Sequence, residues 1–144
     1  MHASDSTEQR EIETVILENL KAEYSDIKSY VLKPKESEKL SFQIDGYSES
    51  TNSYFEFYAG IEELKVGQKK KLATDILKLI TIEKIIEKPI NKFIVLIDKK
   101  IENKLLSDSW LSKSVQLFNI EIIVIDISDE LMSKLKIAKV RQRR

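Results

Sequence analysis

The 144-residue chain has no cysteine and a single histidine, His2, close to its first residue. The lack of cysteine excludes disulfides, thiolate zinc sites and thiol nucleophiles. One histidine in a polar terminal stretch leaves no material for a Ser-His-Asp relay or a histidine-rich metal site. The three glycines (Gly46, Gly60 and Gly67) cannot form a Walker loop or a dinucleotide-binding turn. Any catalysis must therefore depend on carboxylates, lysines and a hard metal ion.

Long apolar runs and an excess of charge are also missing. No run approaches the roughly 20 residues of a membrane span, and no signal peptide is recognisable, so the sequence predicts a cytoplasmic protein without a membrane partner. With 42% hydrophobic residues, the chain can bury one core, so we expect one domain over residues 1–144. The 24 basic and 24 acidic side chains cancel, and nucleic-acid binding would need a local patch. The clearest patch is a basic C-terminal tail, residues 138–144.

Hydrophobic periodicity predicts an α/β fold with a mixed central sheet flanked by helices. Two β-branched runs, KFIVLI and IEIIVIDI, are typical of strands that are buried on both faces. The expected order is a helix at 7–23, a short strand at 29–32, a hairpin of LSFQID and SYFEFYA, a helix at 67–88, KFIVLI, a crossover helix within 101–118, IEIIVIDI and a helix from about 128.

The hairpin carries the first candidate site residues. Its strands alternate with period two, which predicts that Ile44 shares a face with Phe55 and Phe57, while Asp45 and Glu56 share the other face. One or two carboxylates are the usual protein ligands of Mg²⁺, so Asp45 and Glu56 are candidate metal ligands. A metal held there would activate a water molecule for hydrolysis.

The helix that follows carries the candidate cations. Gln68, Lys71 and Asp75 are spaced by three and four residues and fall on one side of the helix. Lys69 and Lys70 point away from this side of the helix. Because they are cations outside the candidate site, we expect them to contact phosphates.

The order helix, three strands, helix, strand, with Asp45 on the second strand and Glu56 on the third, resembles the PD-(D/E)xK superfamily of restriction-endonuclease-like nucleases over about residues 7–126. Glu56 follows Asp45 after a gap of eleven positions, within the spacing of that family. The patterns E-x-Y-A from Glu56 and Q-x-x-K-x-x-x-D-x-L-K-L from Gln68 are also similar to a group of bacterial proteins.

This resemblance implies a Mg²⁺- or Mn²⁺-dependent endonuclease that acts on DNA, and it implies a homodimer, since many members pair to cut two strands. The family lysine two positions after Glu56 is replaced by Tyr58. Superfamily members with a displaced lysine are known, so Lys71 is expected to take that role, with Gln68 beside it. Glu13 matches a first-helix glutamate of many members.

Other readings stay open. Tyr58 in place of lysine is compatible with an inactive nuclease-like domain that binds nucleic acid or protein through residues 65–71 and through Arg141 and Arg143 of the tail. The tail can instead fold against the acidic first helix, and Glu56 can be an ordinary solvent-facing strand residue. A small-ligand site at the carboxyl ends of FIVLID and IIVIDI is a third interpretation, which no glycine-rich turn supports.

Overall fold

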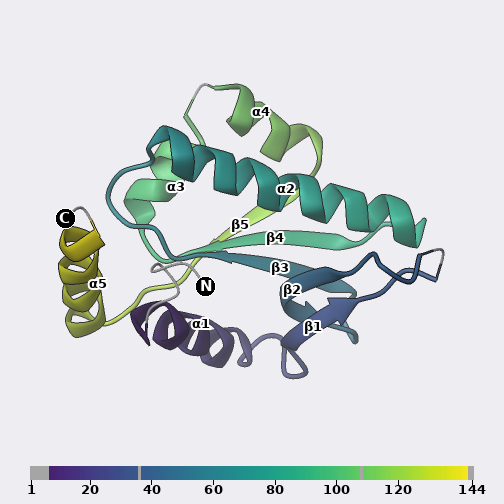
Figure 1. Cartoon of the computed structure of the whole chain (residues 1–144), viewed down its shortest axis with the longest axis horizontal. Helices are drawn as coiled ribbons and strands as arrows, with labels where there is room; N and C mark the ends of the chain where they lie inside the picture. Colours follow the sequence, from purple (N-terminus) through teal and green to yellow (C-terminus); the bar gives the residue numbers. More distant parts are fainter. Residues whose placement is uncertain (1–6, 36, 108, 143–144) are drawn as a thin grey trace.

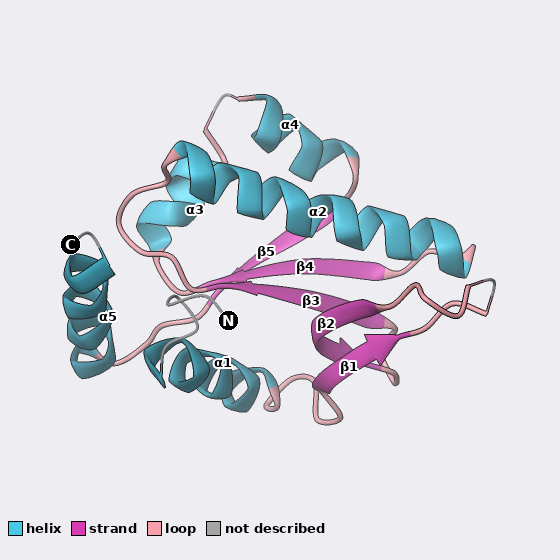
Figure 2. Cartoon of the chain, viewed as in Figure 1, coloured by secondary structure: helices cyan, strands magenta, loops and turns pink. Residues whose placement is uncertain are grey.

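The structure is a computed structural model that describes residues 7–35, 37–107 and 109–142, with the elements shown in Figures 1 and 2. Candidate residue Arg143 and His2 lie outside these ranges. In chain order the elements are α1 (Thr7–Leu20), β1 (Lys28–Leu32), β2 (Phe42–Ser48), β3 (Ser53–Tyr58), α2 (Val66–Ile86), β4 (Asn91–Leu96), α3 (Lys99–Leu105), α4 (Trp110–Leu117), β5 (Ile120–Val124) and α5 (Asp129–Gln142).

The five strands form one sheet in the order β1-β2-β3-β4-β5. The first three strands pair antiparallel, and β3, β4 and β5 pair parallel. Helices α2, α3 and α4 cover one face of the sheet, and α1 and α5 cover the other (Figure 2). The prediction of an α/β fold with a mixed sheet between helices is therefore confirmed.

Local sequence signals explain where the elements end. Asn52 adopts a positive φ of 53° in the β2–β3 turn, a conformation that asparagine tolerates better than most residues. Helix α2 closes on Glu87 in the left-handed region, and Pro89 follows two residues later. This chain reversal leads directly into β4, so β3 and β4 lie side by side and parallel.

Strand β2 contains an extra residue that changes which side chains share a face. Between two paired positions, β1 advances from Lys28 to Tyr30 while β2 advances three residues, from Tyr47 to Ile44. Such a β-bulge reverses the alternation along the strand. Ile44 consequently packs in the core on the α2 side, whereas Phe55 and Phe57 pack in the core on the α1 side. The prediction that these three residues share a face was wrong.

Two further predictions need correction. The crossover contains two helices rather than one, because Ser109 starts a new helix by accepting a hydrogen bond from the backbone N–H of Ser112 at 3.2 Å. Strand β4 is buried on both faces, but β5 is an edge strand on which Glu121 is exposed and residues 122–124 are only half-buried. In the described ranges, no helix combines the length and apolar character needed to cross a membrane.

Candidate functional site

The centre of the site is Glu56, a carboxylate on β3 whose side chain is only 1% exposed. One of its oxygens, Oε1, pairs with the ammonium group of Lys78 on α2. The other, Oε2, accepts a hydrogen bond from the backbone N–H of Asp45 at 3.1 Å. Glu56 is therefore not a solvent-facing strand residue, since both its oxygens have partners inside the protein.

Asp45 lies in the bulged part of β2, opposite Glu56. Its Oδ2 accepts a hydrogen bond from the backbone N–H of Phe57 at 2.8 Å. The paired positions of β2 and β3 run from Ser48 opposite Ser53 to Gly46 opposite Phe55 and end there. Beyond that point the backbone hydrogen bonds between the strands are replaced by two side-chain hydrogen bonds. Each carboxylate accepts a hydrogen bond from a backbone N–H of the other strand. The structure thus brings Asp45 and Glu56 together at the place where the two strands separate.

Lys78 of α2 contacts both β2 and β3 from the face of the sheet that α2 covers. Besides Glu56 on β3, its Nζ donates a hydrogen bond to the carbonyl oxygen of Gln43 on β2 at 2.9 Å. Burial lowers the pKa of Lys78, but the hydrogen bond to Glu56 and the surrounding carboxylates outweigh this and raise the pKa above its usual value. Lys78 is therefore a permanent cation at the site.

Burial raises the pKa of Glu56, and the negative charge of Asp45 raises it further, to about 7 from the ordinary 4.5. The hydrogen bond and positive charge of Lys78 act in the opposite direction and only partly compensate. A carboxyl group with this pKa changes its protonation state close to neutral pH, as acid–base groups of enzyme sites do.

The sequence-predicted cation, Lys71, does not reach Glu56. Its Nζ lies 3.2 Å from Oδ2 of Asp75, a buried residue of the same helix. Burial raises the pKa of Asp75, while the charge of Lys71 lowers it. Lys78 lies seven residues, or about two helical turns, beyond Lys71. Lys78 is not among the predicted site residues, although its spacing places it on the same side of α2.

The other predicted catalytic residues lie around this centre rather than in it. The Oε1 atom of Gln68 accepts a hydrogen bond from the backbone N–H of Lys65 at 2.7 Å, which closes the N-terminus of α2. Glu13 is half-buried on α1, the helix that covers the opposite face of the sheet from α2. The hydrogen bond of Gln68 lies at the end of its own helix and involves neither Glu56 nor Lys78.

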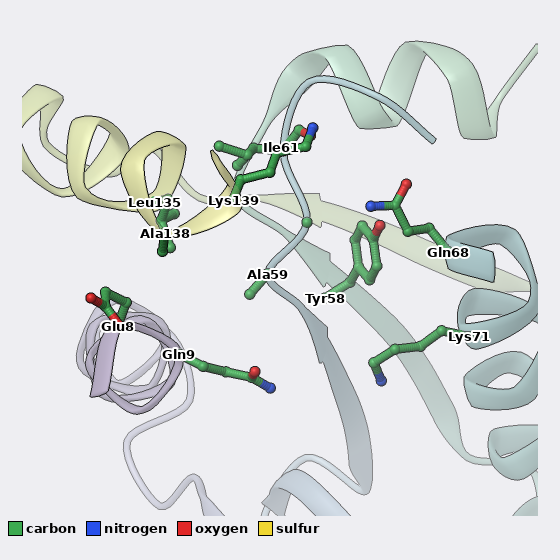
Figure 3. Close-up of a pocket in the computed structure, with 11 residues that line it drawn as sticks. Glu8, Gln9, Tyr58, Ala59, Ile61, Gln68, Lys71, Leu135, Ala138 and Lys139 are labelled. Atoms are coloured by element: carbon green, nitrogen blue, oxygen red, sulfur yellow. The ribbon is translucent and has the colours of Figure 1, made fainter. Parts of the chain in front are cut away.

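A cavity of about 240 Å³ lies beyond the carboxyl end of β3, and both Gln68 and Lys71 line it. In Figure 3, Lys71 from α2 and Gln9 from α1 point toward the same space. Tyr58, two positions after Glu56, lies beside it, and its buried hydroxyl has no hydrogen-bond partner among the described residues. Burial raises the pKa of Tyr58 to about 12, so it remains a neutral phenol.

The candidate nucleic-acid contacts fall into two groups. Lys69 and Lys70 are exposed near the N-terminus of α2. Arg141 of α5 instead pairs with Glu8 of α1 at 2.6 Å. This ion pair favours the interpretation in which the described part of the tail folds against the acidic first helix.

Within the described ranges, no group of three or more histidine, aspartate or glutamate side chains is placed to hold a metal ion. A cation at this site would therefore be held by the pair Asp45 and Glu56. One or two carboxylates are the usual protein contribution to a Mg²⁺ site, so the donor types fit. A metal ion on Oε1 of Glu56 would have to displace the ammonium group of Lys78, which pairs with that oxygen. Comparisons of the chain with protein-family models, with curated proteins and with solved structures found no match.

Proposed function

We propose that this protein is a Mg²⁺- or Mn²⁺-dependent phosphodiesterase acting on DNA, a variant of the PD-(D/E)xK nucleases in which Lys78 replaces the family lysine. The observation that supports this most directly is the meeting of Asp45, Glu56 and Lys78 where β2 separates from β3. Two acids and one cation at that position are the parts that the family resemblance requires. A cytoplasmic location and a homodimer stay predictions.

Each residue of this set has a distinct role in the proposal. Asp45 and Glu56 would hold the metal ion, which when bound supplies an activated water and neutralises charge on the phosphate. Lys78 offers a fixed positive charge that stabilises the negative charge developing on the phosphate oxygens. The raised pKa of about 7 belongs to the metal-free Glu56, and a bound divalent cation would favour its charged, metal-ligating form.

A cleavage assay tests the proposal. Supercoiled plasmid and circular single-stranded DNA are incubated with the full chain in Mg²⁺, in Mn²⁺ or in EDTA. We expect cleavage only with a divalent ion, no cleavage by Glu56→Gln, and a rate about 100-fold lower for Lys78→Gln, the usual cost of removing one electrostatic group from a transition state. Lys84→Gln, an exposed position on the same helix, is the matched control and should cleave at the wild-type rate.

The same assay compares Lys71 and Lys78 of α2. If Lys71→Gln loses activity and Lys78→Gln does not, the family lysine has been displaced to Lys71 as the sequence suggested. Cleavage by Glu56→Gln at the wild-type rate, or no cleavage of either substrate with either metal, would refute the hydrolase proposal.

One observation favours a second candidate, an inactive nuclease-like domain that binds nucleic acid. Both oxygens of Glu56 are already bonded, one to Lys78 and one to the Asp45 backbone. In this candidate the ammonium group of Lys78 takes the place of a metal ion beside Glu56, and the cluster only stabilises the fold. This candidate predicts DNA binding in EDTA without turnover in Mn²⁺, with an affinity that falls as salt rises.

A further inference from the structure

A second hollow, which we call the Trp110 groove, lies between the N-terminal half of α2 and the α3–α4 segment. Its volume is about 610 Å³, and it is separate from the cavity beside Tyr58. The three helices that form it lie on the same face of the sheet (Figure 1). The lining includes Leu64, Lys69, Lys70, Lys104, Leu105 and Trp110.

The groove is positively charged. Lys69 and Lys70 from α2 and Lys104 from α3 form no ion pair in the part of the chain that the structure describes. No acidic side chain is among the described residues that line it, and the first turn of α2 contains no acid. Lysines near a helix N-terminus oppose the helix dipole, so their presence there adds positive potential at a cost in stability. This arrangement suits an anionic ligand.

The rim of the groove carries the only tryptophan of the protein. Trp110 is the first residue of α4, and it is 72% exposed. It is therefore not a core residue, although an indole is among the side chains that gain most from burial. Leu64, Leu105 and Leu111 supply an apolar floor beside it.

We propose that the Trp110 groove binds single-stranded nucleic acid, with a base stacked on the indole and neighbouring phosphates bound by Lys69, Lys70 and Lys104. An aromatic platform beside unpaired cations is the usual chemistry of single-strand binding. A duplex keeps its bases stacked on each other and offers none to Trp110. An acidic protein segment would satisfy the lysines but would leave the aromatic ring without its flat partner.

This inference does not depend on the hydrolytic site. None of the residues that bind Glu56 lines the groove, and Lys71 lines the other cavity. The groove can therefore hold a strand in an active nuclease or in an inactive binding domain. Because Trp110 is the single tryptophan, its fluorescence reports directly on the proposed contact.

The test is a titration of the full chain in EDTA with an oligo(dT) of about 12 nucleotides, within the usual site size of single-strand binding folds. We expect the Trp110 fluorescence to be quenched. Anisotropy of a labelled oligonucleotide should show binding at least about tenfold weaker for Trp110→Ala, and little changed for Trp110→Phe, which keeps a stacking surface. The plot of log affinity against log salt should have a slope of about −2 if three phosphates are neutralised.

Charge variants and competitors separate the alternatives. Lys69→Gln/Lys70→Gln should reduce the salt slope to about −0.7, whereas Lys84→Gln/Lys88→Gln at the other end of α2 should leave it unchanged. Glu56→Gln should bind as wild type, so loss of cleavage and loss of this binding are distinguishable. Binding without quenching, or equal affinity for a duplex of the same length, would overturn the proposal. So would heparin that binds as tightly as the oligonucleotide and whose affinity Trp110→Ala does not change. Stronger quenching by polyglutamate than by the oligonucleotide would also overturn it.

Discussion

Replacing Glu56 by glutamine removes a carboxylate that lies between the sheet and α2, and it keeps nearly the same volume and shape. The amide oxygen can still accept the hydrogen bond from the backbone N–H of Asp45. Lys78 loses its anionic partner, but its side chain is 26% exposed and can turn toward water. The variant therefore isolates the electrostatic contribution of one buried acid.

The magnitude follows from the pKa of Glu56, which is about 7 in the folded protein against an ordinary 4.5. A raised pKa means that the folded state binds this proton more tightly than the unfolded chain does. The penalty for burying the charge is therefore absent below pH 4.5, grows through the interval and is complete above pH 7. At 1.36 kcal/mol per pH unit, it amounts to roughly 3 kcal/mol.

Urea unfolding of the wild type and of Glu56→Gln, measured from acid to mildly alkaline pH, gives the difference in their free energies of unfolding at each pH. We expect the variant to gain about 3 kcal/mol relative to the wild type across this range. Other titrating groups, such as Asp75, are present in both proteins and cancel in the difference. A difference that stays constant within about 0.5 kcal/mol, or one that changes in the opposite direction, would show that Lys78 rather than burial controls Glu56.

Two further substitutions test neighbouring parts of the structure by the same unfolding measurements. Lys78→Met removes the cation that lowers the pKa of Glu56, so the cost should be small in acid, where the carboxyl is protonated in both proteins, and should grow as the pH rises above 7, toward about 3 kcal/mol. A cost that does not change with pH would contradict the ion pair. Gly60→Ala places a Cβ 2.2 Å from the hydroxyl oxygen of Tyr58, so the ring or the loop must move, and we expect a loss of about 1–3 kcal/mol; wild-type stability would show that the loop yields freely.

Much of the fold could be predicted from local patterns. The hairpin, the long helix that stops shortly before Pro89 and the buried β4 strand each follow from periodicity and from turn residues that act over a few positions. The pairing of Asp45 with Glu56 could also be anticipated, because a short turn brings their strands together. The face of the sheet on which Ile44 lies could not be predicted. A bulge depends on how β2 fits between β1 and β3, and the alternation of residues within β2 does not reveal it.

The choice between Lys71 and Lys78 of α2 illustrates the limit most clearly. Periodicity places Lys71, Asp75 and Lys78 along one side of the helix, and this much the sequence determines by itself. Which lysine meets Glu56 depends on how far the helix is shifted along the sheet, and packing of the whole apolar face sets that shift. Only the tertiary structure therefore assigns Lys78 to the buried acid, because a displacement of two helical turns changes the partner without altering any local pattern.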